Sequence, residues 1–413
     1  MFISGGKPLK PSVKLRPARC PGAHFRRKCW RKSPTFASGI AWFSLVCRQW
    51  NDVIFGLCPS ADYLLPLRSY SYSDLCIDHV PSLLRSSARR YRNLEVNWEE
   101  SELRPDNRED TFFTHLDQAL VILAEKGSIK CLWLTAPLDQ RMVRFFAKHE
   151  ALIDSLEELW VTISTKCFTY TVSNTKWTPV QGRLSNLRSL KWDEYENYTG
   201  EIFKDFIFGL SMPKVTKVKL RRGHDFESRD RSLIELRDAE NVCELTVANL
   251  EEYCSRQYFK VARPKLCRLR LNNTLNKMAN QELLEIASNL PNVQHLNISM
   301  VWIDFATSLS LASMLQSLTE LTMDLHLVNL THFSKKLQDI HGLTILHLNC
   351  HSRCTVEESI QIELLKLVEF RCRYEINESD SRVFLFCPRI AVFEQTSDVS
   401  NGGNAIFFQL QSF

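Results

Sequence analysis

The sequence has no long apolar run. Of its 413 residues 44% are hydrophobic and 24% are charged, but no stretch approaches the roughly 20 consecutive apolar residues that a membrane-spanning helix needs. The opening residues, MFISGGKPLKPSVKLRPARC, also lack the apolar core of a secretory signal peptide. We therefore expect no membrane contact, a location in the cytoplasm, the nucleus or both, and 14 cysteines that stay reduced as thiols.

The short motifs of common enzymes are also absent. The chain contains no G-x-S-x-G, no phosphate-binding glycine loop and no H-E-x-x-H. Its cysteines form no C-x-x-C pair, and the cluster His347, Cys350, His351 and Cys354 lies at the end of an expected strand. There a structural role for the thiols is favoured over a metal site. We expect no catalysis, no cofactor and no metal.

Positive charge is concentrated at the start of the chain. The formal net charge is +5, but residues 1–36 hold ten Lys or Arg and no acidic residue, so the remainder carries a net charge of −5. Because the excess belongs to this one segment, it does not indicate a nucleic-acid-binding protein. Residues 1–40 are rich in Pro and Arg without apolar periodicity, which predicts a disordered tail, and a nuclear signal or a transit peptide is an alternative.

One pattern recurs through the rest of the chain. It reads L-x-x-L-x-L, with Val, Ile, Met or an aromatic residue allowed at each apolar place, and most copies follow one another within the roughly 20 to 29 residues of a leucine-rich repeat. The copies start at Tyr91, Ile129, Leu156, Leu187, Val215, Val242, Leu266, Val293, Leu318, Leu343, Leu367 and Ile390. Each copy predicts a short strand whose fourth and sixth residues face a core.

This arrangement resembles leucine-rich-repeat proteins. The resemblance implies an α/β fold over residues 91–413, a solenoid of about twelve irregular repeats with curved parallel strands and outer helices. Apolar residues at three- and four-residue steps predict such helices at Leu138–Leu152, Glu201–Leu210, Lys277–Leu290 and Glu357–Leu365.

A second resemblance precedes the repeats. The segment SLVCRQWN, from Ser44 to Asn51, resembles the second half of an F-box, which binds a Skp-type adaptor and through it a cullin–RING ubiquitin ligase. The resemblance assigns adaptor binding to one apolar set: Phe43, Leu45, Val46, Cys47, Trp50 and Ile54. Residues 41–90 would then be a small helical F-box-like segment and a linker. From the residues alone, the same apolar helix face could instead be a cap that seals the first repeat.

The strand residues between the apolar positions suggest a binding surface. In the middle of the array they are mainly cationic, which favours an acidic or phosphorylated protein segment as substrate. The candidates are Lys191, Lys217, Lys219, Arg221, Arg268 and Arg270. Trp133 and Trp160 occupy equivalent places in the preceding repeats and are candidate hot spots, unless the 97–128 insertion covers them.

The sequence thus leads to a functional hypothesis. We expect a non-catalytic substrate-recognition adaptor of a Skp–cullin–F-box ubiquitin ligase, part of ubiquitin-dependent protein degradation, which acts through protein–protein interaction and binds no nucleic acid. The alternative is a leucine-rich-repeat interaction scaffold without a ligase. A third class, an extracellular receptor domain, would need a signal peptide and cysteine-rich caps.

Overall fold

The computed structural model of the chain forms two compact units, Met1–Asp62 and Tyr63–Phe413. The residues that the structure describes all belong to the second unit. They are 64–68, 79–86, 91–98, 108–127, 129–137, 140–164, 180–194, 208–222, 234–247, 258–272, 280–301, 305–325, 337, 339–350, 360–374, 382–397 and 407–410. The predicted tail, 1–40, lies outside the described residues, and of the predicted F-box-like segment and linker, 41–90, only 64–68 and 79–86 are described.

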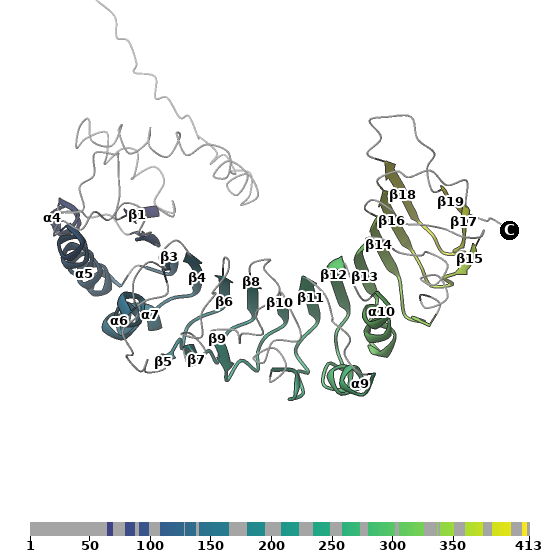
Figure 1. Cartoon of the computed structure of the whole chain (residues 1–413), viewed down its shortest axis with the longest axis horizontal. Helices are drawn as coiled ribbons and strands as arrows, with labels where there is room; N and C mark the ends of the chain where they lie inside the picture. The colour runs from purple at the N-terminus through teal and green to yellow at the C-terminus, as the bar shows by residue number, and fades with distance from the viewer. Residues whose placement is uncertain are drawn as a thin grey trace, which may run out of the picture. The chain divides into compact units, whose positions relative to one another are not determined.

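The chain has an α/β fold built on a parallel main sheet of 13 strands, whose order in the sheet is their order in the chain (Figure 1). The strands are β1 (Leu64–Arg68), β2 (Asn93–Asn97), β3 (Cys131–Pro137), β4 (Glu158–Ser164), β6 (Ser189–Glu194), β8 (Lys217–Arg222), β10 (Glu244–Val247), β11 (Arg268–Asn272), β12 (His295–Val301), β13 (Glu320–Leu325), β14 (Ile345–Cys350), β16 (Glu369–Tyr374) and β18 (Val392–Ser397). Because neighbouring strands are parallel, the chain has to return to the same end of the sheet between one strand and the next.

Twelve of these strands lie on the twelve predicted copies of the pattern, from β2 to β18. In the first eleven copies the fourth and sixth residues are buried, as Leu94 and Val96 are in β2. Parallel pairing keeps these positions in register, so that Leu269 of β11 lies beside Leu245 on one side and Leu296 on the other. The remaining strand, β1, precedes residue 91 and pairs with β2 in the same register.

Helices and short strands form a second layer. Figure 1 shows α6 (Gln140–Lys148), β5 (Val180–Arg183), β7 (Phe208–Ser211), β9 (Ile234–Arg237) and α9 (Asn280–Ser288) along one side of the main sheet. The other members are α4 (Val80–Ser86), α5 (Arg108–Lys126), α7 (Glu150–Asp154), α10 (Phe305–Met314), β15 (Ile360–Glu363), β17 (Arg382–Phe386) and β19 (Phe407–Leu410). One apolar core lies between the two layers.

Two of the four predicted outer helices are found, and in the other two the described residues include a strand instead, while 201–207 and 357–359 lie outside the described residues. Helices α6 (140–148) and α7 (150–154) cover most of the predicted helix 138–152, and α9 lies inside the predicted helix 277–290. Residues 208–210 instead belong to β7, and the predicted helix 357–365 contains β15. In β15 the sequence Ile360-Gln-Ile362-Glu alternates with period two, which is a strand pattern that the helical interpretation overlooked.

A recurrent turn leads into the main-sheet strands. Its first and fourth residues are apolar or packed, and the N–H of the fourth donates to the carbonyl of the first, as in Leu187 to Leu184 (3.2 Å) and Val215 to Met212 (3.2 Å). Pro213, Pro264, Pro291 and Pro388 fill the second place of four such turns. Proline is suited to that place because its fixed φ matches the turn. This four-residue signal precedes the pattern and was not used in the sequence analysis.

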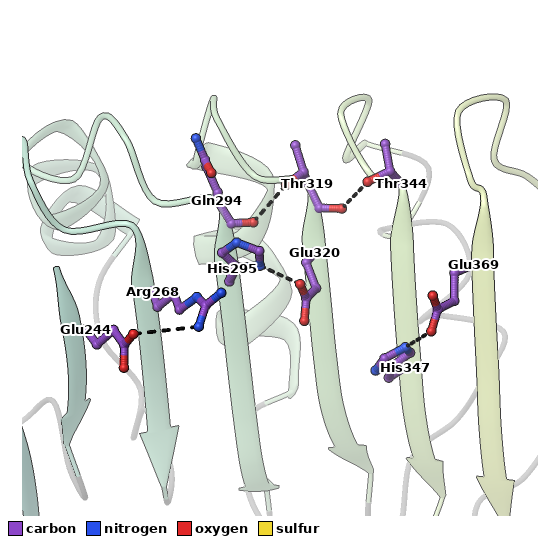
Figure 2. A network of polar contacts seen from close by, with 9 residues as sticks. All are labelled: Glu244, Arg268, Gln294, His295, Thr319, Glu320, Thr344, His347 and Glu369. Carbon is purple, nitrogen blue, oxygen red and sulfur yellow. Dashed lines mark hydrogen bonds and ion pairs between the residues drawn. The ribbon is translucent and has the colours of Figure 1, made fainter. Parts of the chain in front are cut away.

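Backbone hydrogen bonds join consecutive turns in a ladder. The carbonyl of Gln294 accepts the N–H groups of Thr319 and Glu320, both at 2.9 Å, and the carbonyl of Thr319 accepts those of Thr344 and Ile345 at 2.8 and 3.0 Å. Figure 2 shows this part of the carbonyl ladder. The Thr344 hydroxyl donates to the same Thr319 carbonyl (3.0 Å), and the Cys243 thiol donates to the Thr216 carbonyl (3.3 Å). Consecutive turns are therefore held together mainly by backbone hydrogen bonds.

Candidate binding surface

The side chains that alternate with the buried positions form the second face of the main sheet, called here the polar face. In β10, for example, Glu244 and Thr246 lie on it while Leu245 and Val247 are buried. Because every strand pairs in register, the polar face consists of rows that cross the sheet. One row runs Glu95, Trp133, Trp160, Lys191, Lys219, Thr246, Arg270, Asn297, Thr322, His347, Arg371 and Glu394.

The register brings the predicted cationic residues together on β6, β8 and β11, with β10 between the last two. This set is called the basic patch: Lys191, Lys217, Lys219, Arg221, Arg268 and Arg270. Two carboxylates, those of Asp193 and Glu244, lie among them on the polar face. This part of the face therefore holds six cations and two anions. On β12 and β13 the same face carries Glu320 and Asp324 and no Lys or Arg. Strands β12 and β13 therefore separate the basic patch from the next cations of the polar face, Arg371 and Arg373 on β16.

Part of this charge is neutralised within the patch. Glu244 lies between two cations, with Oε2 at 3.1 Å from Nζ of Lys217 and Oε1 at 3.6 Å from Nη1 of Arg268 (Figure 2 shows the second pair). Lys191 lies 2.6 Å from the carboxylate of Asp193, whose side chain is almost fully buried. These ion pairs could not be predicted from the sequence, because they depend on which strands are neighbours.

Lys219 differs from its neighbours. Within the described part of the chain neither Lys219 nor Arg221 forms an ion pair. Burial lowers the pKa of Lys219, and the positive charges of Arg221, Lys191 and Arg270 lower it further, whereas Asp193 opposes the shift. A lysine whose pKa falls for these reasons lies in a locally positive potential. The like charges around Lys219 therefore add to the effect of its burial.

The two candidate tryptophans stack on each other beside the patch. The ring centroids of Trp133 and Trp160 are 5.2 Å apart with an interplanar angle of 19°, and Nζ of Lys191 lies 5.1 Å from the Trp160 ring. Both tryptophans are half-buried. The Nε1 atom of Trp133 is enclosed and has no hydrogen-bond partner among the described residues. The pair therefore offers less open aromatic surface than two outward tryptophans would.

Histidine–carboxylate pairs follow on the next strands. His295 Nδ1 lies 2.5 Å from Glu320, and His347 Nε2 lies 2.9 Å from Glu369 (Figure 2). Glu369 also pairs with Arg371 at 2.7 Å. The hydrogen bond from His347, together with the positive charges of Arg371 and His347, lowers the pKa of Glu369 against the opposing effect of burial. The sequence analysis missed both pairs. His295 and Glu320 occupy the same place of adjacent copies, which could have indicated the first pair, whereas His347 and Glu369 lie two places apart.

A hollow of about 220 Å³ lies at this end of the polar face. Its polar lining comes from β13 to β18 and includes His347, Asn349, Arg371, Arg373 and Glu394. Charges of both signs are paired there, since Arg371 lies 3.4 Å from Glu394. The charges that line the hollow therefore favour neither an anionic nor a cationic ligand.

No arrangement suited to a metal is found in the part of the chain that the structure describes. Among those residues no group of three or more His, Cys, Asp or Glu side chains could hold an ion. Of the sequence cluster around Cys350, His347 pairs with Glu369, while His351 and Cys354 fall outside the described residues. The predicted adaptor-binding set, Phe43 to Ile54, also falls outside them.

Comparison of the chain with models of known protein families found no match, and neither did comparison with curated protein sequences. Among the described helices none is long and apolar enough to cross a membrane.

Proposed function

We propose that the protein is a non-catalytic recognition subunit that binds a protein partner on the polar face of its main sheet. The observation that carries the proposal is the in-register row of unlike side chains across the strands, from Trp133 through Lys219 to Arg371. A rigid sheet that displays a broad polar surface is suited to binding another macromolecule, because little entropy is lost when its backbone is already ordered.

We further propose that the α/β fold is, more specifically, a leucine-rich-repeat solenoid. Three regularities support it: the copies of the pattern on successive strands, the second-layer elements between them, and the carbonyl ladder that joins the turns. In such an array each unit buries its apolar face only against its neighbours. The twelve copies would then be twelve irregular repeats, with β1 as an additional strand before them.

The ligase assignment rests on the segment SLVCRQWN and on its place before the repeats. We propose that Phe43, Val46 and Trp50 contact a Skp-type adaptor, with the other members of the predicted set beside them. The cullin–RING assembly would then be held at one end of the chain and the substrate on the polar face. Ubiquitin transfer would be accelerated by proximity and not by chemistry in this chain. Such a ligase operates in the cytoplasm or the nucleus.

Affinity capture from cells tests the ligase assignment. The full chain is compared with a variant that carries Val46→Asp, Cys47→Ser and Trp50→Gln, and the bound adaptor and cullin are quantified. A matched control carries Arg48→Ala, Asn51→Ala and Asp52→Ala on the opposite face of the same predicted helix. We expect the adaptor and cullin to be captured by the full chain and the control and to be lost from the apolar variant.

The second candidate function is an interaction scaffold without a ligase, which the cap interpretation of the apolar helix favours. It predicts that the full chain captures neither adaptor nor cullin. It also predicts that the apolar variant lowers the thermal midpoint, because a cap seals the core at the end of a repeat array. The two functions are thus separated by capture and by a melting curve on the same variants.

A further inference from the structure

We infer that Cys243 and Cys267 form a reversible oxidation site, at which a hydroperoxide links the two thiols across neighbouring turns of the array. The inference goes beyond the proposed function, because it concerns how the main sheet is modified and not what it binds. It starts from two cysteines that hold the same place in successive turns.

The two cysteines are neighbours in the carbonyl ladder. The N–H groups of Cys267 and Arg268 both donate to the carbonyl of Cys243, each at 3.0 Å. One residue later, Glu244 of β10 pairs in register with Arg268 of β11. Neighbouring strands lie about 4.8 Å apart, and a disulfide requires Cα atoms about 4.4 to 6.8 Å apart. The register therefore places the two cysteines within reach of each other, although they are 24 residues apart in the sequence.

The two thiols have the same orientation. The Cys243 thiol donates to the carbonyl of Thr216 at 3.3 Å, and the Cys267 thiol donates to the carbonyl of Cys243 at 3.4 Å. Each side chain thus lies against the turn before its own, and the sulfur of Cys267 lies close to the backbone of Cys243. Rotation about the Cα–Cβ bond of Cys243, with a small approach of the two turns, brings the sulfur atoms together.

Accessibility distinguishes this pair from the other described cysteines. Cys243 and Cys267 are partly exposed, whereas Cys131, Cys372 and Cys387 are buried. Oxidation of a thiol depends on its exposure to the oxidant. Among the described residues, the two cysteines that an oxidant can reach are thus also the two that adjoin each other.

The reaction consumes one hydroperoxide. One thiol, reacting as its thiolate, attacks a peroxide oxygen, which breaks the O–O bond, releases an alcohol (or water, from hydrogen peroxide) and leaves a sulfenic acid. The second thiol attacks the sulfenic sulfur, and the S–S bond forms as water leaves. With hydrogen peroxide, two thiols and one peroxide thus give one disulfide and two water molecules. Exchange with an external dithiol restores both thiols.

The link would join β10 to β11 at the start of both strands. It would lie directly before Glu244 and Arg268, whose side chains form an ion pair of the basic patch at 3.6 Å. A disulfide restricts the conformations that the chain gains when it opens. Oxidation should therefore suppress local opening of these two strands and hold this part of the polar face in place.

Hydrogen peroxide is the probe. The full-length chain is reduced, freed of reductant and treated with peroxide, after which the remaining thiols are blocked and the monomer is digested without reduction. Trypsin together with a protease that cleaves after glutamate separates Cys243 from Cys254, a nearby cysteine outside the described residues. By mass spectrometry we expect the Cys243–Cys267 link to be at least about tenfold more abundant than any other disulfide of either cysteine, because the register holds them together. Dithiothreitol should remove it.

Serine variants provide matched controls. At the same place of other turns, Thr216, Thr319 and Thr344 donate their hydroxyl groups to the preceding carbonyl at 3.2, 3.2 and 3.0 Å. A serine can therefore take over the contact that either cysteine makes. Cys243→Ser and Cys267→Ser should each abolish the linked peptide and keep the thermal midpoint of the reduced protein within about 2 °C of the original.

Hydrogen exchange gives a second measurement on the same samples. In the oxidised chain, exchange in β10 and β11 should slow by at least about threefold relative to the reduced chain, and peroxide should cause no such slowing in Cys267→Ser. Separate sulfinic acids on the two cysteines, or a disulfide from either one to a different cysteine as the main product, overturns the inference. Unchanged or faster exchange in the linked chain would mean that the link forms only when the two turns have come apart, which also rejects the site.

Discussion

His149 lies between α6 and α7 with its ring almost fully covered, 2.8 Å from the carboxylate of Asp117. Burial lowers the pKa of His149, and nearby Lys148 adds to the effect, although the hydrogen bond and the negative charge of Asp117 oppose it. A pKa below the unfolded value means that the folded state resists protonation. The stability contribution is therefore complete above about pH 6.5 and is lost as the pH falls through the folded pKa.

This residue gives a pH-dependent prediction. We expect the thermal midpoint to fall as the pH is lowered from 7.5 to 5.5, and to fall by at least about 2 °C less in His149→Gln, whose amide cannot be protonated in this range. Melting curves at a series of pH values measure the effect. Identical pH profiles of the two proteins would assign the acid sensitivity to other groups.

Cys387 gives a second prediction on the scale of the residue. Its thiol is buried, and burial raises the pKa of Cys387 to about 11 although a backbone hydrogen bond at Leu364 opposes the shift. At pH 8 only about one thiol in a thousand is then a thiolate, the form that reacts. We expect iodoacetamide to leave Cys387 unmodified in the folded protein and to alkylate it after denaturation, as peptide mass spectrometry would show. Rapid alkylation in buffer would contradict the buried environment.

At the scale of the element, the packing between consecutive turns restricts which residue can occupy the third place of a turn. A Cβ atom on Gly342 would lie 2.6 Å from the carbonyl oxygen of Leu318, a backbone atom of the preceding turn. Consecutive turns therefore approach each other closely at this glycine. Other turns carry larger residues at the same place, such as Lys366 in the turn from Leu364 to Leu367, where the side chain is exposed.

A substitution at this place should be costly in one turn and mild in the other. We expect Gly342→Ala to lower the free energy of unfolding by about 1–3 kcal/mol, because the backbone of the neighbouring turn must move. Lys366→Ala should change it by less than about 0.5 kcal/mol. Denaturant titrations of the two variants provide the measurement, and similar values for both would show that the turns are not closely packed at Gly342.

The elements were not equally predictable. The main strands were predicted because leucine or a similar residue must fill the fourth and sixth places of each copy, as Leu346 and Leu348 do in β14. The second layer was harder, because short strands such as β15 and short helices both place apolar residues every few positions. Helix α5 falls in the supposed insertion 97–128, although Phe112, Leu116 and Leu120 recur at four-residue steps and are all buried.

The binding surface was predictable in its membership but not in its charge balance. The alternation within each strand is sufficient to assign Lys219 and Arg270 to the same face. It does not reveal that Glu244 pairs with Lys217 and Arg268, or that Thr246 lies between two cations. Those relations depend on the register between strands, which is fixed by turns and loops of variable length.

On the scale of the whole molecule, each strand of the main sheet contacts mainly the two strands beside it. Strand β11 pairs with β10 and β12, and its central Leu269 is almost fully buried. We expect Leu269→Ala to lower stability locally by about 2–5 kcal/mol. Hydrogen exchange should accelerate most in β10, β11 and β12 and least in β3 and β16, as in arrays with nearest-neighbour coupling. Uniform acceleration in all strands would indicate that the sheet unfolds as one unit.

The carbonyl ladder has a consequence for how such a protein can change during evolution. Its principal bonds join backbone groups, so they form in the same way whichever side chains the strands carry toward the polar face. A mutation at Thr246 or Asn297 can therefore alter what the surface recognises while the frame that supports it keeps its bonds. New specificity can arise by single substitutions that the scaffold tolerates, and recognition and folding can be selected almost independently of each other.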